Sequence, residues 1–164
     1  MFTQAPSKFR EIIEAKKVME NEANAIKKCA EKIDENFPKA LDILAVSDGK
    51  VIVTGIGKSG HLAKKVAATL CSTGTASAFM HPTEAIHGDL GIHQEGDPVI
   101  YLSNSGTTPE LIFLEPVFKS RQAKIVGILG NIKSPLAKKV DCVLNSSVSL
   151  EADPLGIVPT ASFM

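Results

Sequence analysis

The sequence lacks net charge, and this absence excludes two broad classes of partner. Its 164 residues carry 18 Lys and Arg against 18 Asp and Glu. No overall positive field therefore draws the chain to nucleic acid or to an anionic membrane surface. We expect no nucleic-acid partner and no membrane partner, and any anion-binding site must be local.

Cysteines and long apolar runs are also scarce. Cys29, Cys71 and Cys142 are widely spaced and odd in number, which favours reduced thiols in a cytoplasmic protein over a disulfide framework. The N-terminus lacks the apolar run of a signal peptide, and no later run approaches membrane-spanning length. We expect a cytoplasmic protein.

The length suits one domain, 1–164, with a helical segment over 1–47 and an α/β core over 48–164. From Lys8 to about Asn36 the pattern is helical, and an apolar stripe recurs every seven residues: Ile12, Met19, Ile26 and Ile33. Such a helix can face its own core, and heptad spacing also suits packing against another subunit. A second helix is predicted over 37–46.

The remainder alternates short apolar runs with helical segments. The predicted strands cover 51–54, 76–80, 99–103, 124–129 and 141–145, and the predicted helices cover 61–72, 109–120 and 134–139. Runs such as "VIYLS" are continuously apolar, which indicates strands covered on both faces of a parallel sheet. The fold class is therefore doubly wound α/β with about five strands and helices on both faces. Ligands bind such sheets beyond the carboxyl ends of the strands.

The first strand ends in "TGIGKSGH", a stretch that admits two nucleotide-loop interpretations. Gly55, Gly57 and Gly60 satisfy the dinucleotide-binding glycine spacing, whereas Gly57-Lys58-Ser59 resembles the end of a P-loop. The P-loop interpretation fails because Ile52 occupies the position that requires its first glycine. Lys58 and Ser59 predict direct side-chain contact with an anion.

The dinucleotide interpretation also needs an acidic residue at the end of the second strand. The sequence instead has "FMHP" there, with Glu84 three residues beyond His81. A dinucleotide-binding domain therefore stays as the weaker alternative.

The third strand ends in "SNSGTTPE", which combines hydroxyls, an amide and a glycine in one turn. Thr108 followed by Pro109 favours the start of a helix. Backbone N–H groups and the positive end of the helix dipole would converge on this turn. Ordinary capping by Ser and Thr explains any one hydroxyl, but four within six positions favour a phosphate monoester site.

The second strand end, "HPTEAIHGDLG", offers residue types that bind metals: His81, Glu84, His87 and Asp89. Their spacing matches no recognised metal signature, and we predict no metal. We expect a short helical turn over 84–87 that brings His87 near the ligand.

Together, "GIGKSGH", "HPTEAIHGDLG", "SNSGTTPE" and "EADPLGIVPTAS" resemble the sugar isomerase (SIS) domain of the arabinose-5-phosphate isomerase family, in the family's order. The resemblance runs from the N-terminal helix to the last residue. It implies interconversion of D-ribulose 5-phosphate and D-arabinose 5-phosphate through an enediol, for Kdo, lipopolysaccharide or capsule biosynthesis. The implied reaction requires no cofactor. It further implies a homodimer or homotetramer and allows CMP-Kdo as an end-product ligand.

The resemblance also assigns roles to individual residues. The substrate phosphate falls to Ser103, Asn104, Ser105 and Thr108. The reacting end of the sugar falls to Lys58, His87, Glu110 and Glu151. Of the two carboxylates we prefer Glu151 as the base, because Glu110 can serve simply to stabilise the first turn of its helix, whereas the loop of Glu151 has no strong structural demand for a carboxylate. Further substrate-contact candidates are Gly57, Ser59, His81 and Glu84.

The chain departs from the family at its end. Family members usually continue past "PTAS" into a further helix and a His-Pro-Gly-Gly segment, and many carry CBS domains, whereas this sequence stops at Met164. We therefore expect a shortened chain to bind sugar phosphate and to isomerise poorly. A non-catalytic sugar-phosphate-binding or regulatory module is the main alternative.

Overall fold

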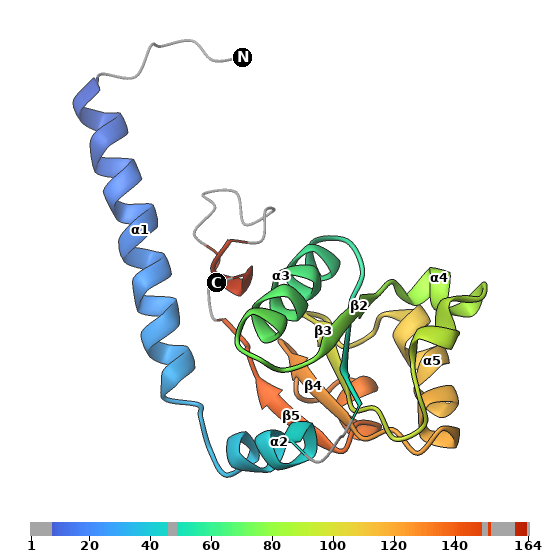
Figure 1. The fold of residues 1–164 in the computed structure, drawn as a ribbon. Coiled ribbons are helices and arrows are strands. Elements are labelled where there is room, and N and C mark those ends of the chain that lie inside the picture. The colour runs from blue at the N-terminus through green and yellow to red at the C-terminus, as the bar shows by residue number, and fades with distance from the viewer. Residues whose placement is uncertain (1–7, 46–48, 149–150, 152–159, 164) are drawn as a thin grey trace. The chain divides into compact units, whose positions relative to one another are not determined.

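A five-stranded parallel sheet forms the centre of the fold. The computed structural model describes residues 8–45, 49–148, 151 and 160–163. The strands are β1 (Val51–Thr54), β2 (Ser77–Met80), β3 (Val99–Ser103), β4 (Ile125–Leu129) and β5 (Cys142–Asn145), in the spatial order β2-β1-β3-β4-β5 (Figure 1). Every pairing is parallel. The predicted fold class is confirmed.

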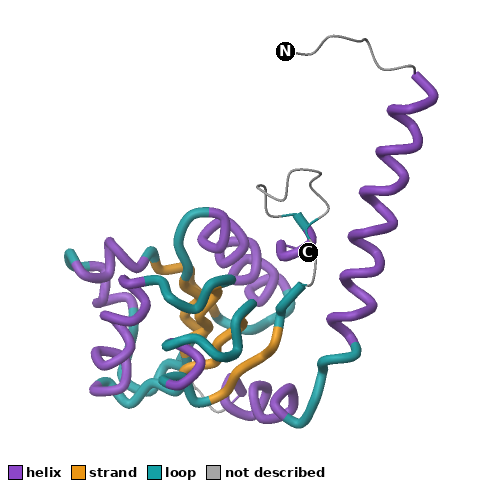
Figure 2. Tube along the Cα trace, turned by 180° about the vertical axis from the view of Figure 1, so that it is seen from behind, coloured by secondary structure: helices purple, strands orange, loops and turns teal. Residues whose placement is uncertain are grey.

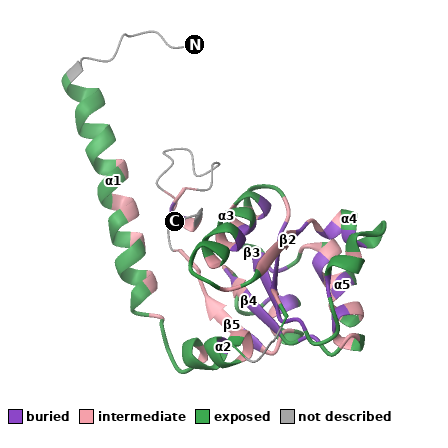
Figure 3. Cartoon of the chain, viewed as in Figure 1, coloured by how far each residue is buried: buried purple, intermediate pink, exposed green. Residues whose placement is uncertain are grey.

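Helices cover both faces of this sheet, as the continuously apolar strands require. On one face lie α2 (Asn36–Ala45) and α3 (Lys58–Ser72), which pack on strand residues such as Val53 and Ile100. On the other lie α4 (Pro82–Ile86) and α5 (Pro109–Ser120), which pack around Ile52 and Tyr101. The central strands β1, β3 and β4 are consequently the most buried elements, whereas the edge strands β2 and β5 are mostly half-buried (Figure 3).

The chain runs through short loops and single turns between these elements (Figure 2). Two 3₁₀ turns, η1 (Asp89–Ile92) and η2 (Leu136–Lys138), precede β3 and β5. The helix predicted over 134–139 is thus only the turn η2. The strands match their predicted ranges, except that β2, β4 and β5 each begin one residue later.

Three of the predicted helices have boundaries that differ from those in the structure. Helix α3 begins at Lys58 instead of residue 61, which places Lys58 and Ser59 in its first turn. The short helix α4 begins at Pro82 and ends at Ile86, so that His87 is its C-cap. The long N-terminal helix α1 (Lys8–Ala30) ends six residues before the predicted limit. The predicted end of α2 at residue 46 lies outside the described residues.

The chain divides into two compact units. One comprises residues 1–32 with 148–164, and the other comprises residues 33–147, which include the sheet. In the first unit, α1 contacts the turn η3 (Ala161–Phe163). The single-domain boundaries expected from the sequence stay a prediction. No helix in the described ranges is long and apolar enough to cross a bilayer.

Candidate active site

The strand order reverses between β1 and β3, and this reversal positions the candidate site. The chain passes from β1 to its neighbour β2 and then crosses to β3 on the other side of β1. In open α/β sheets, ligands bind at such a point, beyond the carboxyl ends of the strands. The loop after β1 lies against the end of β3 there: a Cβ on Gly55 would lie 3.0 Å from the carbonyl oxygen of Leu102, the next-to-last residue of β3.

The loop after β1 leads directly into the first turn of α3. Gly57 is the N-cap, with φ of 60°, a conformation that favours glycine. Lys58 is exposed and Ser59 half-buried in the following turn. A cationic side chain and the N–H groups of a 15-residue helix therefore face the same edge of the sheet.

Packing accounts for the last glycine of "TGIGKSGH". A Cβ on Gly60 would lie 2.8 Å from the Gly55 carbonyl oxygen, because α3 passes close to the end of β1. The spacing that resembles a dinucleotide fingerprint therefore serves helix–strand contact here. The strand β2 ends at Met80, and the nearest following carboxylate, Glu84, is exposed on α4.

The loop after β3 is the second part of the site. Residues 103–108 form what we call the phosphate loop. The buried Ser103 Oγ accepts a hydrogen bond from the Gly106 N–H at 3.0 Å and lies 2.9 Å from Thr108 Oγ1. Both ends of the loop are thereby joined through one hydroxyl. Thr108 is the N-cap of α5, but its side chain makes no capping bond among the described residues.

The exposed part of the phosphate loop presents polar groups outward. The Ser105 Oγ accepts from the Thr107 N–H at 3.2 Å and from Thr107 Oγ1 at 3.0 Å. Because these bonds use the Ser105 oxygen as acceptor, its own hydrogen can be donated to an anion. Asn104 is exposed beside it. The first turn of α5 leaves its N–H groups without intrahelical partners, and Pro109 itself contributes no N–H.

The carboxylates of the predicted site have different surroundings. Glu110 is half-buried in the first turn of α5, where the helix dipole favours its ionised form. Glu151 belongs to the other unit, where its Oε2 accepts from the Thr160 N–H at 2.8 Å, Thr160 Oγ1 at 3.2 Å and the Ser162 N–H at 3.2 Å. Desolvation raises the pKa of Glu151, but the hydrogen bonds from Ser162 and Thr160 together outweigh it and hold the pKa below its ordinary value.

The histidines after β2 divide into a capping residue and an exposed one. His81 is the N-cap of α4, and its Nδ1 accepts from the Thr83 N–H at 3.3 Å. His87 and Glu84 are exposed. Within the described part of the chain, no three His, Cys, Asp or Glu side chains are grouped to hold a metal. Residues 152–159, which carry most of the "EADPLGIVPTAS" motif, lie outside the described residues.

Sequence reasoning missed the loop after β4. The Gly130 N–H donates to the Ser103 carbonyl at 3.2 Å, and the Leu136 N–H donates to the Gly106 carbonyl at 3.1 Å. The available signal was the glycine directly after a predicted strand, which marks close backbone approach.

A second missed group lies at the opposite edge, near the amino ends of the strands. The buried His93 accepts from Arg121 Nε at its Nδ1 (3.2 Å), and its Nε2 lies 3.0 Å from the Asp97 carbonyl oxygen. The Asp97 carboxylate in turn pairs with Lys50 at 3.1 Å. Burial lowers the pKa of His93, as do the charges of Arg121 and Lys50, against a smaller opposing effect of Asp97.

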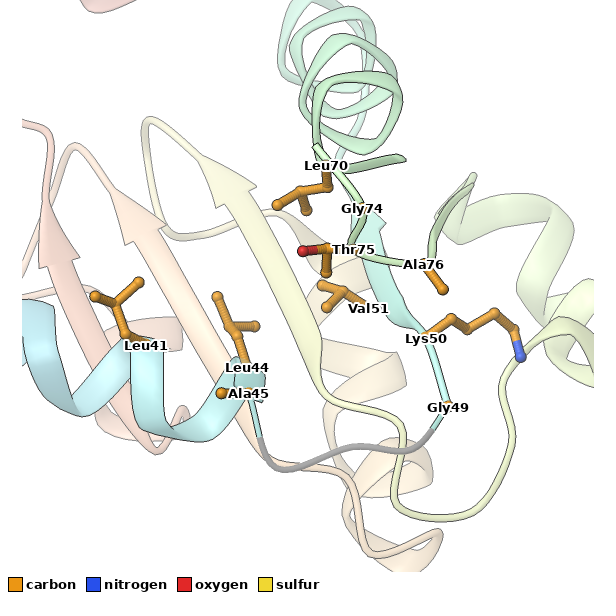
Figure 4. A pocket seen from close by; sticks show the side chains of 10 residues that line it. All are labelled: Leu41, Leu44, Ala45, Gly49, Lys50, Val51, Leu70, Gly74, Thr75 and Ala76. Atoms are coloured by element: carbon orange, nitrogen blue, oxygen red, sulfur yellow. The ribbon is translucent and has the colours of Figure 1, made fainter. Parts of the chain in front are cut away.

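A cavity of about 500 Å³ also lies at this amino edge. Leu44, Val51 and Leu70 are among its apolar lining residues, and Lys50 also lines it (Figure 4). It is thus separated by the length of β1 from the loops that carry Lys58 and the phosphate loop.

A family model of the SIS domain matches residues 43–163. The chain belongs to the SIS family. The match includes the loops after β1 and β3 that form the candidate site of this SIS domain.

Named relatives agree with this assignment. Arabinose 5-phosphate isomerase KdsD of Pseudomonas aeruginosa is 46% identical over 141 residues, which are 86% of this SIS domain and 43% of the relative. Arabinose 5-phosphate isomerase GutQ of Salmonella typhimurium is 43% identical over 132 residues, 80% of this chain and 41% of the relative. The chain thus spans less than half the length of these relatives.

A solved structure provides the comparison in three dimensions. An Escherichia coli CFT073 protein in complex with A5P superposes with a TM-score of 0.91 at 37% identity, covering 96% of this chain and 84% of that protein.

Proposed function

We propose that this SIS domain is an aldose–ketose isomerase that interconverts D-ribulose 5-phosphate and D-arabinose 5-phosphate. One observation carries the proposal. The first turn of α3, which contains Lys58, and the phosphate loop follow the neighbouring strands β1 and β3, where the strand order reverses. Named isomerases at 46% and 43% identity support the choice of substrate. The proposed role is synthesis of the Kdo precursor for lipopolysaccharide or capsule.

The reaction moves one proton between neighbouring carbons of the sugar. A base removes a proton from C1 of the ketose, and the negative charge passes to O2. A proton then moves from O1 to O2 through the enediol, and the base returns its proton at C2. Each step needs charge stabilisation on O1 and O2, and none needs an oxidant or a metal.

The residues of this chain supply groups for each step. Ser103, Asn104, Ser105 and Thr108 would hold the phosphate. Lys58, at the start of α3, would stabilise negative charge on the sugar oxygens, and the exposed His87 would transfer the oxygen-bound proton. Further contacts are proposed for Gly57, Ser59, His81 and Glu84.

We keep Glu151 as the proposed base. The hydrogen bonds from Thr160 and Ser162 hold it ionised at neutral pH, the form that a base must have, while lowering its basicity. Glu110 is the competing carboxylate. The assignment is supported if Glu151→Gln loses turnover but keeps its affinity for inorganic phosphate, while Glu110→Gln stays active. If Glu110→Gln loses turnover and Glu151→Gln stays active, the base is Glu110.

We further propose that the protein acts in the cytoplasm as a homodimer or homotetramer. The three cysteines are all described, and none is in a disulfide. Helix α1 exposes large apolar side chains, among them Phe9 and Met19 at 74% and 70%. A second copy of this helix is the proposed partner. CMP-Kdo is retained as a proposed end-product ligand.

NMR of ribulose 5-phosphate in deuterated water tests the isomerase proposal. We expect deuterium to enter the sugar and arabinose 5-phosphate to appear, and Lys58→Ala to slow both by roughly a hundredfold or more, the cost typical of removing one group that stabilises developing negative charge. Lys65→Ala, which removes an exposed lysine later on α3, serves as the matched control.

The same experiment separates the alternative. Specific binding of ribulose 5-phosphate without exchange would identify a non-catalytic sugar-phosphate-binding module. That outcome would match a chain that covers only 43% of a catalytic relative.

A further inference from the structure

We infer that Ser134, in the loop after β4, is a positioning residue that sets the shape of the phosphate loop. The inference rests on the proposed function, because it concerns the same phosphate. It extends the site to a second loop that supplies no predicted ligand contact. We call residues 130–136 the β4 loop.

Sheet register places the two loops side by side. Ser103, the last residue of β3, is paired with Leu129, the last residue of β4. Both loops therefore leave the same edge at the same level. Two backbone hydrogen bonds then join them, from Gly130 N–H to the Ser103 carbonyl (3.2 Å) and from Leu136 N–H to the Gly106 carbonyl (3.1 Å). The phosphate loop is thus fixed at its beginning and at its middle.

Ser134 fills the space directly behind Gly106. Its side chain is buried, with 2% exposed. A Cβ on Gly106 would lie 2.0 Å from Ser134 Oγ and 2.4 Å from Ser134 Cβ. Gly106 has φ of +66°, so it is the residue at which the phosphate loop reverses. The Ser134 side chain therefore limits how closely the backbone at Gly106 can approach the β4 loop.

The Ser134 hydroxyl is itself held in place. Its Oγ accepts from the Ala137 N–H at 3.3 Å, at the start of η2. Leu136, the first residue of η2, is fully buried in the main core. The core thereby fixes η2, η2 fixes the Ser134 side chain, and Ser134 limits the position of Gly106. The Gly106 N–H in turn donates to the Ser103 hydroxyl. A larger side chain at 134 would displace Gly106 and open the Ser103–Gly106 hydrogen bond.

Binding measurements on Ser134→Val and Ser134→Ala test the inference, with inorganic phosphate and ribulose 5-phosphate as probes. The valine variant should raise both dissociation constants by about tenfold, or ~1.4 kcal/mol. Its KM for ribulose 5-phosphate should rise by the same factor with a smaller change in kcat, since phosphate contacts are made equally in the ground and transition states. The alanine variant, which adds no volume, should recover most of the affinity.

Ser77→Val is the matched control. Ser77 is a half-buried serine whose hydroxyl donates to the Ala67 carbonyl at 2.6 Å, at the amino end of β2 and away from the phosphate loop. It should lower thermal stability to a similar extent without changing phosphate affinity. All binding is measured below the unfolding transition of each variant, followed by circular dichroism.

The outcomes separate the two proposals. Wild-type affinity for phosphate in a folded Ser134→Val variant, or an equal loss in Ser77→Val, would overturn the positioning role alone. Sugar-phosphate binding without isomerisation would remove the isomerase proposal and leave the positioning role to be decided by the phosphate dissociation constants. Absence of phosphate binding by the wild-type chain would overturn both.

Discussion

At the scale of the residue, the Tyr101 hydroxyl has an energetic cost in the folded state. The side chain is fully buried against Phe118, and its Oη has no hydrogen-bond partner in the described part of the chain. Burial raises its pKa, and the negative charge of Glu115 raises it further, so the hydroxyl stays neutral. A buried hydroxyl without a partner typically costs about 1–3 kcal/mol.

We therefore predict that Tyr101→Phe raises the free energy of unfolding by about 1 kcal/mol. Urea denaturation of both proteins measures the difference. Thr54→Val offers a parallel case, because Thr54 Oγ1 is also buried without a partner in the described residues. A clear loss of stability in Tyr101→Phe would show that the hydroxyl has a partner in solution.

At the scale of the element, His93 joins the end of α5 to the loop before β3. Arg121 Nε donates to His93 Nδ1, which fixes the neutral tautomer with its hydrogen on Nε2, directed to the Asp97 carbonyl. A second proton would have to occupy Nδ1, facing the Arg121 guanidinium. Burial of the imidazole is the main cause of the lowered pKa of His93, and the Arg121 charge lowers it further.

The pH dependence of stability follows from this shift. The unfolded chain takes up a proton at His93 near its ordinary pKa of 6.5, whereas the folded chain does so only at lower pH. The contribution to stability is therefore complete above about pH 6.5 and is lost progressively as the pH falls below it. We predict a falling unfolding midpoint in urea between pH 7 and pH 5, and a flatter profile in His93→Gln. An equally steep profile in that variant would assign the dependence to other groups.

Local sequence signals predicted the strands but gave the wrong start for α3 and a helix in place of the turn η2. The strands β1 and β3 match their predicted ranges because each is a buried apolar run bounded by turn residues. The start of α3 was missed because Gly60 indicates a loop by propensity, although it is needed for contact with Gly55. The segment 134–139 has helical composition, but Ser134 and Pro135 form the turn that contacts Gly106.

The site residues Ser103 and Lys58 were proposed because hydroxyls and a lysine directly follow apolar strands. The structure places both residues at strand ends, and their roles stay predictions. Ser134 was missed because its importance arises from the register of β3 with β4, which no local pattern encodes. His93 was missed for the same reason, since Arg121 is 28 residues away in sequence.

At the scale of the whole molecule, the exposed apolar side chains of α1 predict self-association. Ile12, Met19 and Ile26 are each more than half exposed, and burying such side chains stabilises an interface by about 1.5–3 kcal/mol each. We predict that Ile12→Glu with Met19→Glu weakens assembly by about a hundredfold or more. Sedimentation velocity measures the change, with Glu14→Gln as a control on the same helix. An unchanged sedimentation coefficient would exclude α1 from the interface.

The two loops of the candidate site come from distant parts of the sequence and meet only when β3 has paired with β1. Residues 55–57 and 104–108 are separated in sequence by α3, β2, α4, η1 and β3. A phosphate that contacts both loops can therefore bind only after this crossover has formed, and it cannot act as a template for early folding. Its binding would instead raise the free energy of unfolding, by about 2.7 kcal/mol at a ligand concentration one hundred times the dissociation constant. The proposed sugar-phosphate ligand would thus protect the chain against proteolysis and heat, more strongly as its concentration rises, and the lifetime of the folded protein would follow the supply of that ligand.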